Sequence, residues 1–163
     1  MKDTRRKGTV GQRERFKDER HDVYLERKKW PEPTSCGTCG AVYQGGRWTW
    51  SSSPAGGNVI TCPACQRIAD NYPAGFVELQ GPFFAAHRDE IRGLIDHIEE
   101  NEKGEHPLER VMRIEDAPDR VLIETTGIHL ARRIGTALER AYEGHLTFKF
   151  GDGMHTIRVT WER

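Results

Sequence analysis

The four cysteines of this 163-residue chain form two Cys-x-x-Cys pairs. Cys36 and Cys39 make the first pair and Cys62 and Cys65 make the second, with 22 residues between the pairs. Each pair places two sulfurs on one tight turn, and this spacing predicts a single tetrahedral zinc site with one Zn²⁺. Four thiolates would fill the coordination shell, so the predicted site is structural rather than catalytic.

A redox-active pair or a disulfide is the alternative interpretation of these cysteines. A redox pair does not need a matching second pair, and neither pair lies in the strand–helix context of a thioredoxin-like motif. The sequence therefore favours zinc over redox chemistry.

Enzymatic motifs are not apparent in the sequence. The seven histidines are scattered, and none forms a His-x-x-x-His pair or accompanies a nucleophile in a known motif. Gly151 and Gly153 indicate a hairpin turn rather than a phosphate loop, because a strand and not a helix is expected after them. We therefore expect a protein that is not an enzyme and has no small-molecule substrate. An RNA-processing enzyme that uses His87, His129 and His145 is a weaker alternative.

The formal net charge is zero, but the charges are unevenly distributed. Residues 1–30 carry a net charge of +5, and residues 31–163 carry −5. Basic N-terminal arms commonly bind nucleic acid, although a simple solvated tail is a serious alternative here. No apolar run approaches the roughly 20 residues that span a bilayer, so no membrane association is expected. The N-terminus lacks the apolar region of a secretory signal, and zinc thiolates suit the reducing cytoplasm.

The patterning predicts an α+β protein in four parts: a basic, largely disordered arm (1–29), a zinc ribbon with four cysteine ligands (30–80), a linking amphipathic helix (81–106) and a small ββαββ domain with an antiparallel sheet (107–163). In the ribbon we expect strands at 41–43, 47–50 and 59–61, with a turn at Gln44-Gly45-Gly46. Residues 76–79 are expected to form a further short strand at its end.

The linking helix is expected to begin at Gly81-Pro82 and to end near Gly104. Its apolar face is formed by residues with helical spacing: Ile91, Leu94, Ile95 and Ile98. In the last part we expect strands at 108–115, 120–125, 146–150 and 157–162 around one helix. Thr125 or Thr126 is expected to cap that helix, which runs to about Glu143.

Nucleic acid is the binding partner that the side chains favour. Trp48 and Trp50 lie on one face of the predicted strand, where they could stack on bases, while Arg47 could contact phosphates. Packing of one or both tryptophans beneath the ribbon is the alternative. Arg132-Arg133 forms a basic patch on the last helix. The candidate RNA-binding residues are Arg5, Arg6, Lys7, Arg13, Arg15, Lys28, Lys29, Arg47, Trp48, Trp50, Arg67, Arg132 and Arg133.

Several motifs also carry a resemblance: Cys-Gly-Thr-Cys-Gly-Ala-Val-Tyr at 36–43, Cys-Pro-Ala-Cys at 62–65, His-Pro-Leu-Glu-Arg-Val at 106–111 and His-Leu-Ala-Arg-Arg-Ile-Gly at 129–135. With these motifs the whole chain resembles a family of short bacterial zinc-ribbon proteins. Residues 35–160 are distantly similar to the N-terminal part of the large-ribosomal-subunit export adaptor of archaea and eukaryotes. This resemblance implies zinc ligation by the four cysteines and binding to ribosomal RNA or protein of the large subunit.

Two functions follow as expectations. The leading one is a non-catalytic, zinc-stabilised RNA-binding protein that associates with the ribosome in stress, hibernation, assembly or quality control. The alternative is a zinc-ribbon module for protein–protein interaction, for example a transcription-associated adaptor, in which the acidic body makes the contact.

Overall fold

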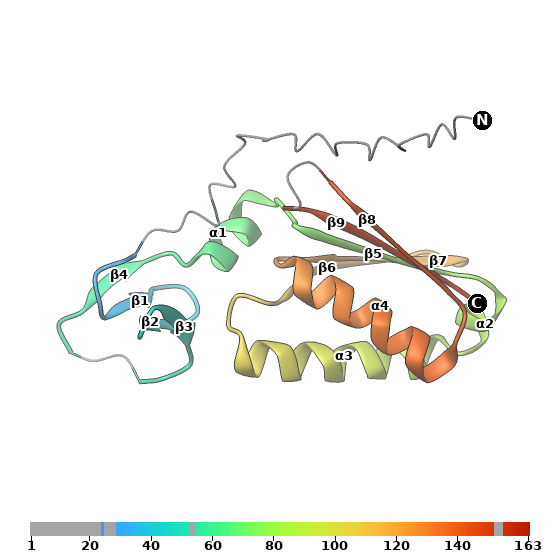
Figure 1. Ribbon diagram of the computed structural model, residues 1–163, viewed down its shortest axis with the longest axis horizontal. Coiled ribbons are helices and arrows are strands. Elements are labelled where there is room, and N and C mark those ends of the chain that lie inside the picture. The colour runs from blue at the N-terminus through green and yellow to red at the C-terminus, as the bar shows by residue number, and fades with distance from the viewer. Residues whose placement is uncertain (1–23, 25–28, 53–54, 152–154) are drawn as a thin grey trace, which may run out of the picture.

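The computed structural model describes residue 24 and residues 29–52, 55–151 and 155–163. The chain forms a small sheet near its N-terminus and a larger sheet that is covered on one face by two helices (Figure 1). This is an α+β arrangement, as the sequence predicts.

The small sheet has the strand order β3-β2-β1-β4. Its strands are β1 (Thr34–Cys36), β2 (Val42–Gln44), β3 (Arg47–Thr49) and β4 (Asn58–Ile60). The β2–β3 hairpin was predicted, and Gly45 and Gly46 have φ angles of 63° and 76° in its turn. A turn with two positive φ angles matches the twist of the flanking strands, and glycine adopts it without strain. Strand β4 pairs with β1 in parallel, so the sheet brings the segments before both cysteine pairs together.

Helix α1 (Pro63–Asp70) follows directly and was not predicted. Cys62 is its N-cap, and the Cys62 side chain accepts a hydrogen bond from the backbone N–H of Cys65. Pro63 occupies the first turn, where its missing N–H costs nothing. The second Cys-x-x-Cys pair is therefore the start of a helix rather than an isolated turn. Asn71 ends the helix in a left-handed conformation.

The larger sheet corrects one prediction, because it has five strands and is mixed rather than antiparallel. Its order is β6-β7-β5-β9-β8. The strands are β5 (Gly75–Gln80), β6 (Val111–Asp116), β7 (Arg120–Thr125), β8 (His145–Phe150) and β9 (Ile157–Glu162). Strand β5, placed by sequence at the end of the ribbon, is the central strand, antiparallel to β7 and parallel to β9. Val77 and Leu79 are fully buried, which requires helices over that face of β5.

Helices α2 (Pro82–Ala86), α3 (Arg88–Glu105) and α4 (Ile128–Tyr142) complete the fold. The predicted helix of 81–106 is broken at His87, which has φ −121° and ψ 26°. The predicted apolar face of α3 is confirmed, because Ile91, Ile95 and Ile98 form a core with the sheet. On α4 the core residues include Leu130, Ile134 and Leu138, and of these Leu130 was not predicted to be buried. Both helices lie on the same face of the larger sheet (Figure 1).

The predicted cap of α4 is wrong. Gly127 is the N-cap, without a side-chain hydrogen bond. Thr125 donates to the carbonyl of Gly127, and Thr126 bonds to the backbone of Leu108 and Arg110. The side chain of Glu109 caps the helix instead, because its Oε2 accepts the N–H of Leu130 at 2.9 Å.

In the described part of the chain, no helix combines the length and apolar character needed to cross a membrane.

Candidate metal centre and adjacent groove

The fold brings the two cysteine pairs together at one edge of the small sheet. Cys36 ends β1, Cys39 follows in the next turn, and Cys62 and Cys65 lie at the start of α1. Their four Sγ atoms lie within 4.8 Å of one another, and no disulfide joins them. Cys36, Cys62 and Cys65 are buried. The four cysteines are therefore positioned to hold one metal ion.

Backbone N–H groups point at these sulfurs. The N–H of Cys62 lies 3.2 Å from Sγ of Cys36, and the N–H of Cys65 lies 3.4 Å from Sγ of Cys62. Burial raises the pKa of Cys62. Burial acts in the same direction on Cys36, but backbone N–H groups outweigh it and lower its pKa to about 6. Such donors stabilise thiolate, the form that binds a metal.

Arg110 reaches this cluster from the half of the molecule with the larger sheet, and no local sequence pattern indicates this contact. Its Nη1 lies 3.3 Å from Sγ of Cys65, and its Nη2 lies 3.1 Å from Sγ of Cys39 and 3.5 Å from Sγ of Cys62. Its Nε donates to the carbonyl of Pro107 at 2.8 Å. Burial acts to lower the pKa of Arg110, but the contacts with Cys65 and Cys39 prevail and raise it above its ordinary value. The guanidinium thus supplies positive charge beside the metal ligands.

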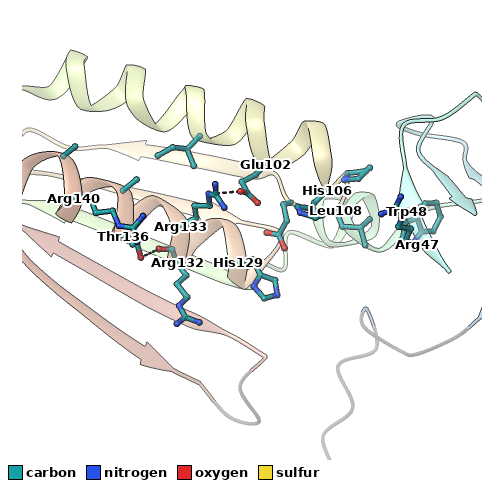
Figure 2. A pocket seen from close by; sticks show the side chains of 15 residues that line it. Arg47, Trp48, Glu102, His106, Leu108, His129, Arg132, Arg133, Thr136 and Arg140 are labelled. Atoms are coloured by element: carbon teal, nitrogen blue, oxygen red, sulfur yellow. Dashed lines mark hydrogen bonds and ion pairs between the residues drawn. The ribbon is translucent and has the colours of Figure 1, made fainter. Parts of the chain in front are cut away.

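A groove of about 1210 Å³ lies between the small sheet and the helices. Residues of β3, of the segment after α3 and of α4 line it (Figure 2). Four of the lining residues are arginines: Arg47 from β3 and Arg132, Arg133 and Arg140 from α4. All four are exposed. The fold therefore gathers positive charge from two distant parts of the sequence into one groove.

The acidic groups of the groove are engaged by neighbouring residues. Glu102 of α3 pairs with Arg133, with 2.8 Å between Oε1 and Nε. Glu109 is held by the start of α4, as described above, and burial raises its pKa. Among the described residues, Arg47, Arg132 and Arg140 form no ion pair with a carboxylate. The guanidinium of Arg132 instead lies 5.9 Å from the ring centroid of Phe148. Three arginines of the groove are consequently available to an anionic ligand.

The two predicted stacking tryptophans have different environments. Trp48 is buried, with ring centroids 5.5 Å from Trp30 and 5.6 Å from Tyr43, so the alternative of packing beneath the ribbon holds for it. Its Nε1 has no hydrogen-bond partner among the described residues. Trp50 is 39% exposed, and its Nε1 donates to the carbonyl of Lys103. Trp48 is therefore a core residue and not an open stacking platform, whereas Trp50 is partly exposed and bonded to α3 through its Nε1.

The remaining candidate RNA-binding residues are separated. Arg67 is only 3% exposed, and its Nη1 donates to the carbonyl of Tyr72 at 3.1 Å. Its side chain is therefore buried and not presented at the surface. Lys29 is exposed. The other candidate residues of the arm lie outside the described residues: Arg5, Arg6, Lys7, Arg13, Arg15 and Lys28.

Comparison with known proteins gave no match: no family model, no curated protein and no solved structure matches this chain.

Proposed function

We propose that this chain is a zinc-stabilised, non-catalytic RNA-binding protein that associates with ribosomal RNA of the large subunit. The observation that carries the proposal is the convergence of Arg47, Arg132, Arg133 and Arg140 on one groove. The resemblance noted in the sequence supports the ribosome as the source of the RNA.

Zinc is the metal that suits four thiolates best. Zn²⁺ binds thiolate at about 2.3 Å in a tetrahedron, whose edges are then about 3.8 Å. Sγ of Cys39 and Sγ of Cys62 are separated by 3.8 Å, which fits one such edge. Four protein ligands leave no open position, so the metal would stabilise the small sheet and would not take part in a reaction. The small sheet has few buried side chains of its own, so metal binding would supply much of its stability.

The groove suits a phosphodiester backbone. Arginine presents several N–H donors in a plane and binds phosphate oxygens through two of them at once. Contacts of this kind position a nucleic acid without reading its sequence. Three of its arginines lie along α4, and Arg47 lies across the groove on β3 (Figure 2). The successive phosphates of a single RNA strand that follows these side chains would pair with one arginine after another.

Two measurements test the proposal. Fluorescence anisotropy with labelled single-stranded RNA should show that log K for binding falls linearly with the logarithm of the salt concentration. The slope of this line should be roughly −0.7 for each phosphate contact. Sucrose-gradient sedimentation of lysate from growing and stationary cells should place the protein with ribosomal particles at low salt. The proposal fails if the protein remains at the top of the gradient under both conditions and binds no RNA.

A protein-interaction module is the second candidate, and one observation favours it. Val59 is 68% exposed, Ile68 43% and Tyr72 56%, and all three belong to the small sheet or to α1 and its C-terminal end. Exposed apolar side chains are common at protein interfaces. Deletion of residues 1–29 distinguishes the candidates: RNA binding should weaken with a flatter salt slope, whereas binding of a protein partner should change little.

A further inference from the structure

Arg110 is the main polar link between the two halves of the fold. It follows α3 and precedes β6, both of which belong to the half with the larger sheet, but its guanidinium contacts three of the four sulfurs. It is 45 residues from Cys65 and 71 from Cys39 in sequence, so these contacts join distant segments. Arg110 is 8% exposed. Water therefore has little access to its guanidinium while the two halves are docked.

Other contacts between the two halves, among the described residues, lie close by. Trp50 donates to the carbonyl of Lys103, and the guanidinium of Arg110 lies 5.9 Å from the Trp50 ring centroid. Leu108 packs against the buried residues of the small sheet. Trp50 is three residues from Arg47, which forms the opposite wall of the groove. The position of that wall is thus set by contacts within residues 103–110.

We infer that Arg110 is a positioning residue: by binding the cysteine sulfurs, it makes the docking of the small sheet, and with it the shape of the groove, depend on a bound metal ion. The inference rests on the proposed zinc site, but not on RNA as the ligand.

The physical reason is the charge of the site. One Zn²⁺ with four thiolates carries a net charge of −2, and a buried guanidinium needs an opposite charge beside it. Among the described residues, Arg110 pairs with no carboxylate, so the sulfur cluster is its counter-charge. The metal also holds the four sulfurs in one place. When it is removed, sulfurs that take up protons lose their negative charge, and the four sulfurs are no longer held in the arrangement that the guanidinium binds, while the apolar contact of Leu108 would remain.

Hydrogen bonds to metal ligands also act on the metal itself. Substitution of such outer residues typically lowers metal affinity about 10- to 100-fold. We therefore expect Arg110→Met to bind one zinc per chain with an affinity lower by this factor, as measured by competition with a chromophoric chelator. In the Co²⁺-substituted protein the sulfur-to-metal charge-transfer band should shift to lower energy, because the thiolates lose a charged donor.

Amide hydrogen exchange followed by mass spectrometry tests the docking. In the wild type, chelation of zinc should accelerate exchange in residues 47–50 and 103–110, while β7 and β9 stay protected. In Arg110→Met both segments should exchange fast even with zinc bound. The matched control is Arg92→Met, since Arg92 is exposed on α3, pairs with Asp96 and touches no cysteine.

The result that overturns the inference is an Arg110→Met protein with zinc affinity within twofold of the wild type and unchanged exchange. If Arg110→Met does not fold, Arg110→Lys replaces it. Lysine keeps the charge but cannot reach three sulfurs at once, so the zinc affinity of Arg110→Lys should be lower than that of the wild type and of the control. The inference is also overturned if Arg110→Lys has the zinc affinity of the wild type and the same charge-transfer band in its Co²⁺-substituted form. No RNA enters these measurements, so their failure and a failure of RNA binding remain distinguishable.

Discussion

Arg133 on α4 and Glu102 on α3 form an ion pair along the groove, with 2.8 Å between Nε of Arg133 and Oε1 of Glu102. The side chain of Glu102 is 9% exposed, whereas that of Arg133 is 67% exposed. The glutamate is thus fixed by the fold, and the arginine is the solvent-facing partner. The pair links the two helices and neutralises one of the four arginines of the groove.

Glu102→Gln is expected to strengthen RNA binding. Glutamine keeps the shape of the side chain but removes the charge that competes with phosphate for Arg133. RNA affinity should rise about three- to tenfold, and the salt slope should steepen by about 0.7 if Arg133 gains one phosphate contact. Since the pair is partly open to solvent, stability should change by about 1 kcal/mol or less.

The control for Glu102→Gln is Glu115→Gln, because Glu115 pairs with Arg113 on β6, outside the groove. An unchanged RNA affinity for Glu102→Gln, with a folded protein, would contradict the role of Arg133 in phosphate binding. The measurement is fluorescence anisotropy over a series of salt concentrations.

Arg132→Ala and Arg140→Ala are each expected to weaken RNA binding. For each variant the loss of affinity should be the same whatever the base sequence of the RNA. Each variant loses a phosphate contact rather than a base contact, so each should lower the salt slope by roughly 0.7. Arg92→Ala is the matched control: Arg92 is exposed on α3, pairs with Asp96 and does not line the groove. An equal loss of affinity in Arg92→Ala would show that binding follows net charge and not the groove.

Local patterns account for the elements that the sequence predicts correctly. The spacing of Ile91, Ile95 and Ile98 defines the buried face of α3, and two adjacent glycines define the β2–β3 turn. These features depend on neighbours within a few residues. The close approach of the two cysteine pairs was also predictable, because four ligands around one ion impose a distance constraint without any knowledge of the fold.

Features that depend on distant contacts were missed or placed wrongly. Strand β5 was predicted as a strand, but nothing local indicates that it pairs with β7 and β9 in the centre of the sheet. The cap of α4 comes from Glu109 and not from the adjacent threonines, because the loop after α3 brings that carboxylate to the helix. Arg110 has no local pattern either, since the three sulfurs that it contacts come from the other half of the molecule.

Substitution of a metal ligand is expected to unfold the small sheet. In Cys65→Ala three sulfurs remain, and they cannot complete the coordination shell, so most of the stabilisation by the metal is lost. Elemental analysis should give one zinc per wild-type chain and far less in the variant, while hydrogen exchange should show loss of protection in residues 34–49. Thr38→Ser, which changes the same turn without removing a ligand, should keep its zinc. Iron, or much less than one equivalent of zinc in the wild type, would contradict the assignment.

Glu109 is expected to stabilise the start of α4 in a pH-dependent way. Glu109→Ala removes the helix cap and should cost about 1 kcal/mol at neutral pH. Burial raises the pKa of Glu109 above its ordinary value, although the N–H of Leu130 acts to lower it. A carboxyl group with a raised pKa in the folded state binds its proton more tightly there than in the unfolded chain. It therefore contributes stability at acidic pH, and this contribution is lost as the pH rises through the folded-state pKa.

Glu109→Gln should lack this dependence. The stability of the wild type minus that of Glu109→Gln should fall as the pH rises from about 4.5 toward neutrality, and taking the difference cancels the pH dependence of metal binding. Glu139→Gln, an exposed substitution on α4, serves as the control. A difference that does not change with pH, or that rises with pH, would contradict the burial of this carboxylate.

Two glycines in helices are expected to respond in opposite ways to alanine. At Gly135 of α4 an added Cβ would lie 2.5 Å from Cγ1 of Val159 and 2.9 Å from Cδ1 of Leu146. Val159 is buried in β9 and cannot move away cheaply, so Gly135→Ala should destabilise the protein by roughly 1–3 kcal/mol. At Gly93 of α3 nothing lies within 4 Å of the added Cβ. Gly93→Ala should therefore stabilise the protein by about 0.5–1 kcal/mol, because alanine favours the helix. Urea unfolding followed by circular dichroism measures both, and a Gly135→Ala variant as stable as Gly93→Ala would show that α4 does not pack this closely on β8 and β9.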